Sequence, residues 1–173
     1  MRPTRGGRWL RLPCRRVQRG GELVQALPQI ADLLDVEPGG RDAVLDTAAR
    51  LLADGSATNT TAIAAALRER EQLGSTGIGH GIAIPHARTH AFDRARGAFL
   101  RLREPIDFEA GDGQPVDLVF ALSVPRHFDR EHLRILSDLA SRFSDPAFRA
   151  ALRGARDIAA LRDLLLAPAT VTD

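Results

Sequence analysis

The residue best prepared for chemistry is His86, which ends a glycine-rich stretch from Gly74 that reads G-S-T-G-I-G-H-G-I-A-I-P-H. Glycines permit positive φ angles and close backbone approach. The apolar run Ile82–Ile84 is too short for a helix, and Pro85 stops it while favouring extended geometry at the residue before. The pattern therefore predicts a strand that ends at His86, beside a glycine-rich turn.

This placement suits a nucleophilic imidazole, because a histidine with a pKa of about 6.5 is largely uncharged at neutral pH. To accept a phosphoryl group, one ring nitrogen must be free, the other must be held by an acceptor, and donors and positive charge must surround the phosphoryl oxygens. An arginine from the preceding helix could supply the charge, and a phosphoryl-binding loop could supply the donors, namely Ser75, Thr76, Gly77 and Gly79. A structural histidine at a strand end fits these residues equally well.

His132 is a second candidate, near the start of a predicted helix and on the same face as Ile135, Leu136 and Leu139. It could be a half-buried structural residue. It could also be a partner imidazole at the rim of a site, since ligands of α/β sheets gather beyond the ends of strands. The sequence pattern leaves both interpretations open.

Other chemistries find little support in the chain. His80, His86 and His90 lack the helical spacing of a zinc site, and the acidic residues fit solvated helix faces and caps better than a hydrolytic carboxylate pair. The G-x-S-x-G and G-x-G-x-x-G patterns of serine hydrolases and nucleotide binders are absent. With Cys14 as the single cysteine, no internal disulfide can form, which is consistent with a reducing, cytoplasmic setting.

Charge is unevenly distributed along the 173 residues. Every basic residue is arginine, and seven of the 24 lie in the first 20 residues, which hold no acid. The remaining chain has 17 arginines against 22 acids, a net charge of −5. This balance disfavours the distributed basic face of a nucleic-acid-binding domain. No apolar stretch reaches the roughly 18–20 residues of a membrane helix, and Trp9–Pro13 is too short for a secretory signal.

The first half of the chain is expected to be helical. Residues 1–22 are Arg- and Gly-rich and predict a disordered extension, and residues 23–34 predict a short helix at the domain edge. Residues 41–53 have apolar positions at helical spacing. A second helix, capped by Thr58 or Asn59, is expected to end in Arg68–Glu71.

The second half alternates between strands and helices. Residues 98–103 predict a strand with one buried face, and residues 116–124 predict a strand covered on both faces. Three helices should follow, over residues 129–143, after Asp145 as far as Gly154, and after a cap at Asp157. Helices before and after a few strands, without repeats, predict a single-domain α/β sandwich.

The glycine-rich stretch resembles the active-site signature of the enzyme IIA domains of the bacterial phosphotransferase system. The match is to the fructose/mannitol class (type 2), and most closely to its nitrogen-regulatory members. The resemblance covers about residues 40–166. It continues through Glu104-Pro-Ile-Asp-Phe-Glu-Ala, Gln114-Pro-Val-Asp-Leu-Val-Phe-Ala-Leu-Ser-Val-Pro and His132-Leu-Arg-Ile-Leu.

This resemblance implies roles for individual residues. His86 would be the phosphorylated histidine, His132 the second active-site histidine, and Arg70 the arginine that helps to bind the phosphoryl group. His80 stands where the family commonly has Asn or another small polar residue, so it is expected to be a turn residue. The region before about residue 38 does not match the usual start of the family.

The resemblance also implies a fold and partners. The expected architecture is a mixed β-sheet flanked by helices, as in mannitol-type enzyme IIA, over residues 23–170. The phosphoryl donor would be a cytoplasmic HPr-like carrier protein, with no metal or nucleotide cofactor. The output would be nitrogen regulation through target proteins. The alternatives are a sugar-transport enzyme IIA that serves a IIB domain, and a binding module that does not transfer phosphoryl groups.

Overall fold

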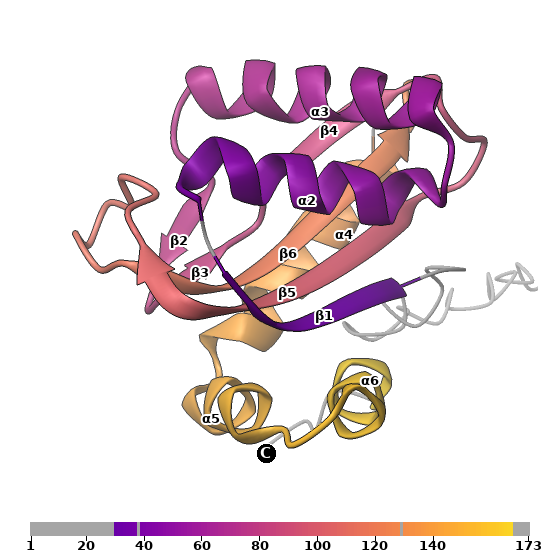
Figure 1. The fold of residues 1–173 in the computed structure, drawn as a ribbon. Coiled ribbons are helices and arrows are strands. Elements are labelled where there is room, and N and C mark those ends of the chain that lie inside the picture. The colour runs from indigo at the N-terminus through magenta and orange to yellow at the C-terminus, as the bar shows by residue number, and fades with distance from the viewer. Residues whose placement is uncertain (1–29, 38, 129, 168–173) are drawn as a thin grey trace, which may run out of the picture.

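The computed structural model describes residues 30–37, 39–128 and 130–167. In this part of the chain, one mixed sheet is flanked by helices on both faces (Figure 1). The strands are β1 (Ile30–Val36), β2 (Gly77–Gly79), β3 (Ile82–Ala83), β4 (His86–Thr89), β5 (Arg96–Ile106) and β6 (Val116–Pro125). The helices are α2 (Arg41–Ala53), α3 (Ala57–Gln72), α4 (Arg130–Ser144), α5 (Pro146–Gly154) and α6 (Ile158–Leu166).

The sheet is built around β6 and has the order β1-β5-β6-β3-β2, with β4 also paired to β6. β5 runs antiparallel to β6, whereas β3 and β4 run parallel to it. β3 pairs with Leu118 and Val119, and β4 pairs further along with residues 122–125. Both therefore follow the same edge of β6, as one strand interrupted at Ile84 and Pro85.

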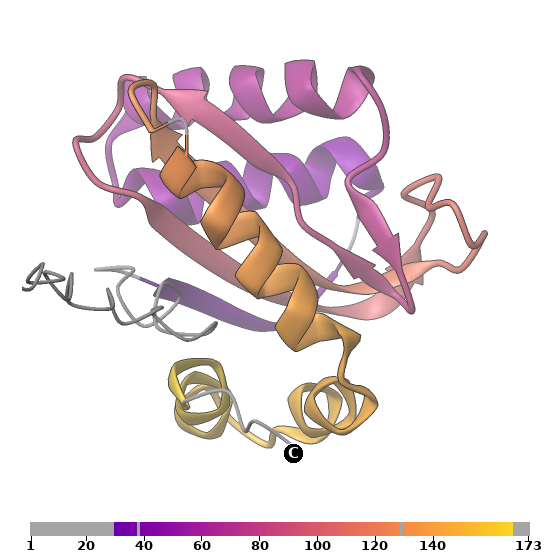
Figure 2. The same cartoon turned by 180° about the vertical axis from the view of Figure 1, so that it is seen from behind.

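Two apolar cores lie on the two faces of the sheet. α2 and α3 cover one face and bury Leu45, Leu52, Ile63 and Leu67 against it. α4 crosses the other face, and α5 and α6 follow past its end (Figure 2). The core on this face contains three phenylalanines, in which Phe120 is in ring contact with both Phe99 and Phe143. Burying each such side chain contributes about 1.5–3 kcal/mol. The strand predicted over residues 116–124 is thus confirmed as covered on both faces.

The helix starts follow ordinary capping chemistry. Asp145 accepts a hydrogen bond from Ala147 N–H at 2.8 Å, and Asp157 accepts one from Ala160 N–H at 2.7 Å, so both predicted starts are confirmed. The predicted cap of α3 at Thr58 or Asn59 is wrong. Ser56 is the cap and accepts from Asn59 N–H at 3.3 Å.

Two other predictions need correction. The short helix expected over residues 23–34 is wrong where the structure describes it, because Ile30–Val36 is a strand that pairs in parallel with β5. A short apolar run fits either element, and pairing along the sheet edge decides between them. The strand at residues 98–103 extends over Arg96–Ile106, and residues 97–100 are buried on both of its faces. Residues 1–29, including the predicted disordered extension, lie outside the described residues.

Arginine side chains close the ends of the last three helices. Arg149 Nη1 donates to the carbonyls of Phe143 and Ser144, at the end of α4, at 2.7 and 2.8 Å. Arg101 reaches from β5 to the end of α5, and Arg142 binds the last carbonyls of α6. The last carbonyls of a helix lack partners within the helix and carry partial negative charge, so a cation stabilises them.

A buried carboxylate fixes the glycine-rich loop to the end of α3. Glu71 is 6% exposed; its Oε1 accepts from Thr76 N–H at 3.0 Å and its Oε2 from the Thr76 hydroxyl at 2.6 Å. Ser75 Oγ donates to the carbonyl of Phe108. A Cβ at Gly77 would lie 2.7 Å from that of Ala110, so only glycine fits there. The loop is therefore held at a fixed distance from the helix that carries Arg70.

We predict that Glu71→Ala destabilises the domain by about 1–3 kcal/mol, because it leaves the buried Thr76 N–H and hydroxyl without acceptors. Urea unfolding measures the loss, and hydrogen exchange should show that the Thr76 amide loses protection. Gln72→Ala, at the exposed neighbouring position of α3, is the control and should change neither quantity. Unchanged stability in Glu71→Ala would contradict the anchoring role.

Candidate active site

The ring of His86 is held from both sides. Its Nδ1 lies 2.9 Å from the carbonyl oxygen of Ile84, and Arg70 Nε donates to its Nε2 at 3.1 Å. A carbonyl can only accept, so the proton is on Nδ1 and the lone pair is on Nε2. Burial lowers the pKa of His86 below its ordinary value of 6.5, although the Ile84 carbonyl acts in the opposite direction. At neutral pH the ring is therefore uncharged, with Nε2 as its nucleophilic atom.

Pro85 explains how the chain supplies this arrangement. β3 ends at Ala83, and His86 is the first residue of β4. The prediction that His86 ends a strand is therefore wrong, because the strand is interrupted at Ile84 and Pro85 and His86 begins its second part. Ile84 N–H bonds to the carbonyl of Thr76 at 3.0 Å, and the Pro85 carbonyl accepts from Leu122 N–H at 2.9 Å. The interruption leaves the Ile84 carbonyl available to the imidazole two residues later.

His132 lies beside His86, with its ring centroid 5.1 Å away and the two planes tilted by 51°. The residue is 6% exposed, and its Nδ1 has no hydrogen-bond partner among the described residues. The pKa of His132 is lowered from 6.5 to about 4, mainly by burial and to a smaller extent by electrostatic repulsion from His86, Arg88 and Arg70. Two uncharged imidazoles thus face each other next to arginine.

The two histidines and Arg70 line one open pocket of about 300 Å³. Arg88 also lines it, two residues after His86 on β4 and hence on the same face of the strand. Leu73, at the end of α3, contributes a largely exposed apolar rim. Sequence reasoning missed Arg88, although the period of two along a strand from His86 could have indicated it. It also missed Glu71, whose burial has no local sequence signal.

The four loop residues predicted to bind the phosphoryl group lie outside this pocket lining. Thr76 is bonded to Glu71, and Ser75 Oγ accepts from Gly77 N–H at 3.0 Å. Gly79 has a positive φ of 91° and packs against Asp112. The structure brings His86, His132 and Arg70 together, and the direct role of Ser75, Thr76, Gly77 and Gly79 stays a prediction.

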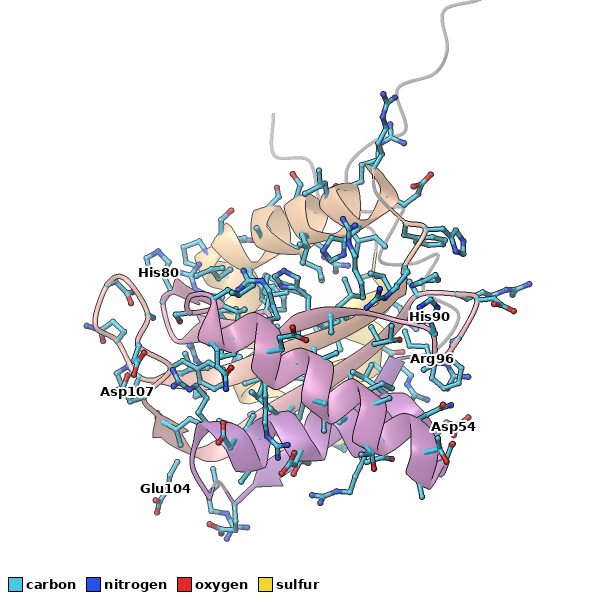
Figure 3. The ribbon with its side chains drawn as sticks, turned by 90° about the horizontal axis from the view of Figure 1, so that it is seen from above. Asp54, His80, His90, Arg96, Glu104 and Asp107 are labelled. Carbon is cyan, nitrogen blue, oxygen red and sulfur yellow. The ribbon has the colours of Figure 1, made fainter. Side chains whose placement is uncertain are left out.

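His80 lies in the turn between β2 and β3, as predicted, with a φ of 55°. Its N–H donates to Asp112 Oδ2 at 2.8 Å. Figure 3 shows His80 and His90 at opposite ends of the molecule, so the three histidines considered for zinc do not share a site. Among the described residues, no helix combines the length and apolar character needed to cross a membrane.

Comparison with known proteins identifies the family. Residues 25–167 match the family model described as "Phosphoenolpyruvate-dependent sugar phosphotransferase system, EIIA 2". The chain is 39% identical over 145 residues to the nitrogen regulatory protein of Pseudomonas aeruginosa, covering 83% of this chain and 94% of that protein.

Solved structures give the same result for the fold. The crystal structure of the nitrogen regulatory protein IIA-Ntr from Neisseria meningitidis superposes with a TM-score of 0.71 at 38% identity, covering 83% of this chain and 94% of that one. IIA mannitol from Escherichia coli matches with a TM-score of 0.64 at 21% identity, over 78% of this chain and 94% of that one, and so supports the mannitol-type fold. The chain belongs to the type 2 enzyme IIA family of the phosphotransferase system, whose members are phosphocarriers, and is most similar to its nitrogen-regulatory members.

Proposed function

We propose that His86 Nε2 accepts a phosphoryl group from the phosphohistidine of an HPr-like carrier protein, and that the phosphorylation state regulates target proteins. The observation that carries this proposal is the double restraint on the ring. The Ile84 carbonyl holds Nδ1 protonated, and Arg70 faces the lone pair on Nε2. A nucleophile needs a fixed tautomer with an unprotonated lone pair directed into the site, and here that lone pair accepts the Arg70 N–H until the phosphoryl group arrives.

The transfer breaks one nitrogen–phosphorus bond and forms another. The Nε2 lone pair attacks phosphorus, and the electron pair of the broken bond returns to the donor imidazole. Because the donor leaves as a neutral ring while His86 retains its Nδ1 proton, the positive charge moves from the donor ring to His86. The Ile84 carbonyl, 2.9 Å from Nδ1, stabilises that charge. Bonds of the same type are exchanged, so catalysis is mainly positioning and charge stabilisation.

The neighbouring side chains fit the needs of a transferred phosphoryl group. In this proposal, the Arg70 N–H that now bonds Nε2 moves to a phosphoryl oxygen as the phosphoryl group approaches, which releases the Nε2 lone pair for attack. His132, with its ring centroid 5.1 Å from that of His86, donates from the second side, and Arg88 adds positive charge at the pocket wall. The regulatory output is supported by the similarity to nitrogen regulatory proteins over nearly their whole length.

The phosphorylation site can be tested directly. With phosphoenolpyruvate, enzyme I and the HPr-like carrier, we expect acid-labile phosphate on His86, located by mass spectrometry. His86→Ala should abolish the label, whereas His90→Ala, which removes an exposed histidine, should retain it. Label that survives His86→Ala contradicts the assignment. Onward transfer to a fructose- or mannitol-type IIB domain would instead contradict only the regulatory output.

Arg70→Gln should slow phosphorylation by about 10²–10³-fold, the usual cost of losing one donor to a developing negative charge. Stopped-flow or quenched-flow transfer assays measure the rate, and thermal unfolding should stay cooperative with an unchanged midpoint. Arg68→Gln is the control, because Arg68 lies on the same helix but pairs with Asp46. If Arg70→Gln unfolds the domain, the residue is structural.

The lowered pKa of His132 has a consequence for stability. Between pH 6.5 and about 4 the unfolded chain binds a proton at this residue that the native state does not, so the free energy of unfolding falls as the pH drops through that window. One group contributes at most about 1.4 kcal/mol per pH unit. His132→Gln should flatten the profile, and NMR should show the His132 ring titrating near pH 4. A ring that titrates at 6.5 or above contradicts the burial argument.

A further inference from the structure

A second pocket, of about 560 Å³, lies between α5, the start of β6 and the turn between β2 and β3. Its wall includes His80, Gln114, Asp117, Arg149 and Arg153. None of these residues lines the histidine pocket. The site is therefore separate from the chemistry proposed above, and what it holds must be inferred from its own side chains.

Arg149 is the unusual member of this wall, because it is an arginine residue that is only 8% exposed. Its Nη1 is used by the carbonyls of Phe143 and Ser144, at the end of α4. Within the described residues, its Nε and Nη2 have no hydrogen-bond partner. They are not fully buried, because His132 Nδ1 is the only fully buried side-chain nitrogen or oxygen without a hydrogen-bond partner in that part of the chain. Both nitrogens therefore keep some accessible surface, and Arg149 lines the pocket.

The carboxylate in the same wall does not neutralise this charge. Asp117 is bound by Arg153 through two hydrogen bonds of 2.7 Å, from Nε and Nη2. This bonding also raises the pKa of Arg153. The pair is tightly packed, since a Cβ at Gly81 would lie 2.6 Å from Arg153 Nη2. Because Asp117 is paired with Arg153, the positive charge of Arg149 is left without a carboxylate in this wall. Buried charges in proteins are normally paired.

We propose that this second pocket binds a small oxyanion, the carboxylate or phosphate group of a metabolite, on the Nε–Nη2 edge of Arg149. That edge presents two parallel N–H donors, which match two oxygens of a carboxylate or phosphate. The side chains of Gln114 and His80 supply further hydrogen-bonding groups in the same wall. The volume lies within the range of small-molecule sites.

Binding there would reinforce an existing connection between distant segments. Arg153 Nη2 donates to the carbonyl of His80 at 2.8 Å, which already joins α5 to the β2–β3 turn. An anion on Arg149 adds a second bridge between the same elements. A ligand that binds only the native state raises the unfolding midpoint with its concentration.

The test is an NMR titration of the ¹⁵N-labelled full chain with inorganic phosphate and, separately, with succinate. We expect saturable shifts at the amides of His80, Gly81 and Gln114 with at least one probe. Shifts with phosphate alone assign a phosphate ligand, and shifts with succinate alone assign a carboxylate. Phosphate could also enter the histidine pocket, so Arg70→Gln serves as a control that removes shifts there and leaves those at Gln114.

Arg149→Met should weaken binding at these amides at least tenfold. Arg149→Lys keeps a cation for the carbonyls of Phe143 and Ser144 but loses the paired donors, so it should fold and bind weakly. Absence of shifts with both probes, or shifts that persist undiminished in a folded Arg149 variant, overturns the proposal. Because phosphorylation of His86 should be unchanged in Arg149→Lys, failure of this inference is distinguishable from failure of the proposed function.

Discussion

The bond between His86 Nδ1 and the Ile84 carbonyl is the constraint on which the site depends. It exists because Pro85 breaks one strand into β3 and β4, so that a backbone acceptor is free two residues before the imidazole. The sheet contributes rigidity, since both halves of the broken strand are paired with β6. The protein thus selects a histidine tautomer with its backbone, and among the described residues no carboxylate bonds to the ring.

The sequence predicted local structure best where the residue types allow few backbone conformations. The closely spaced glycines, Pro85 and the histidine predicted an imidazole at a strand end, and the β-rich run from Val116 to Val124 predicted a strand covered on both faces. Strand β1 could not be predicted in this way, because its identity depends on pairing with β5, far away in the sequence. The same holds for Arg88 and Glu71, whose roles depend on which face of an element meets the site.

Arginine takes several structural roles in a chain that has no lysine. Arg101, Arg142 and Arg149 each bond two or more helix-terminal carbonyls, which joins the last three helices to one another and to the sheet. A planar guanidinium can bridge several acceptors at once, which a single ammonium group does less well. The arginines that give the chain its high isoelectric point therefore include residues that bond helix ends as well as residues that only charge the surface.

The recessed position of His86 also affects how quickly a phosphoryl group attached to it would be hydrolysed. Its ring is only partly exposed, with His132 and Leu73 in the wall around it. A phosphoryl group attached there would meet fewer water molecules than one on an exposed side chain, and exclusion of water slows the hydrolysis of reactive intermediates. The burial that lowers the pKa of the histidines would then also lengthen the lifetime of the phosphorylated state after transfer from a donor.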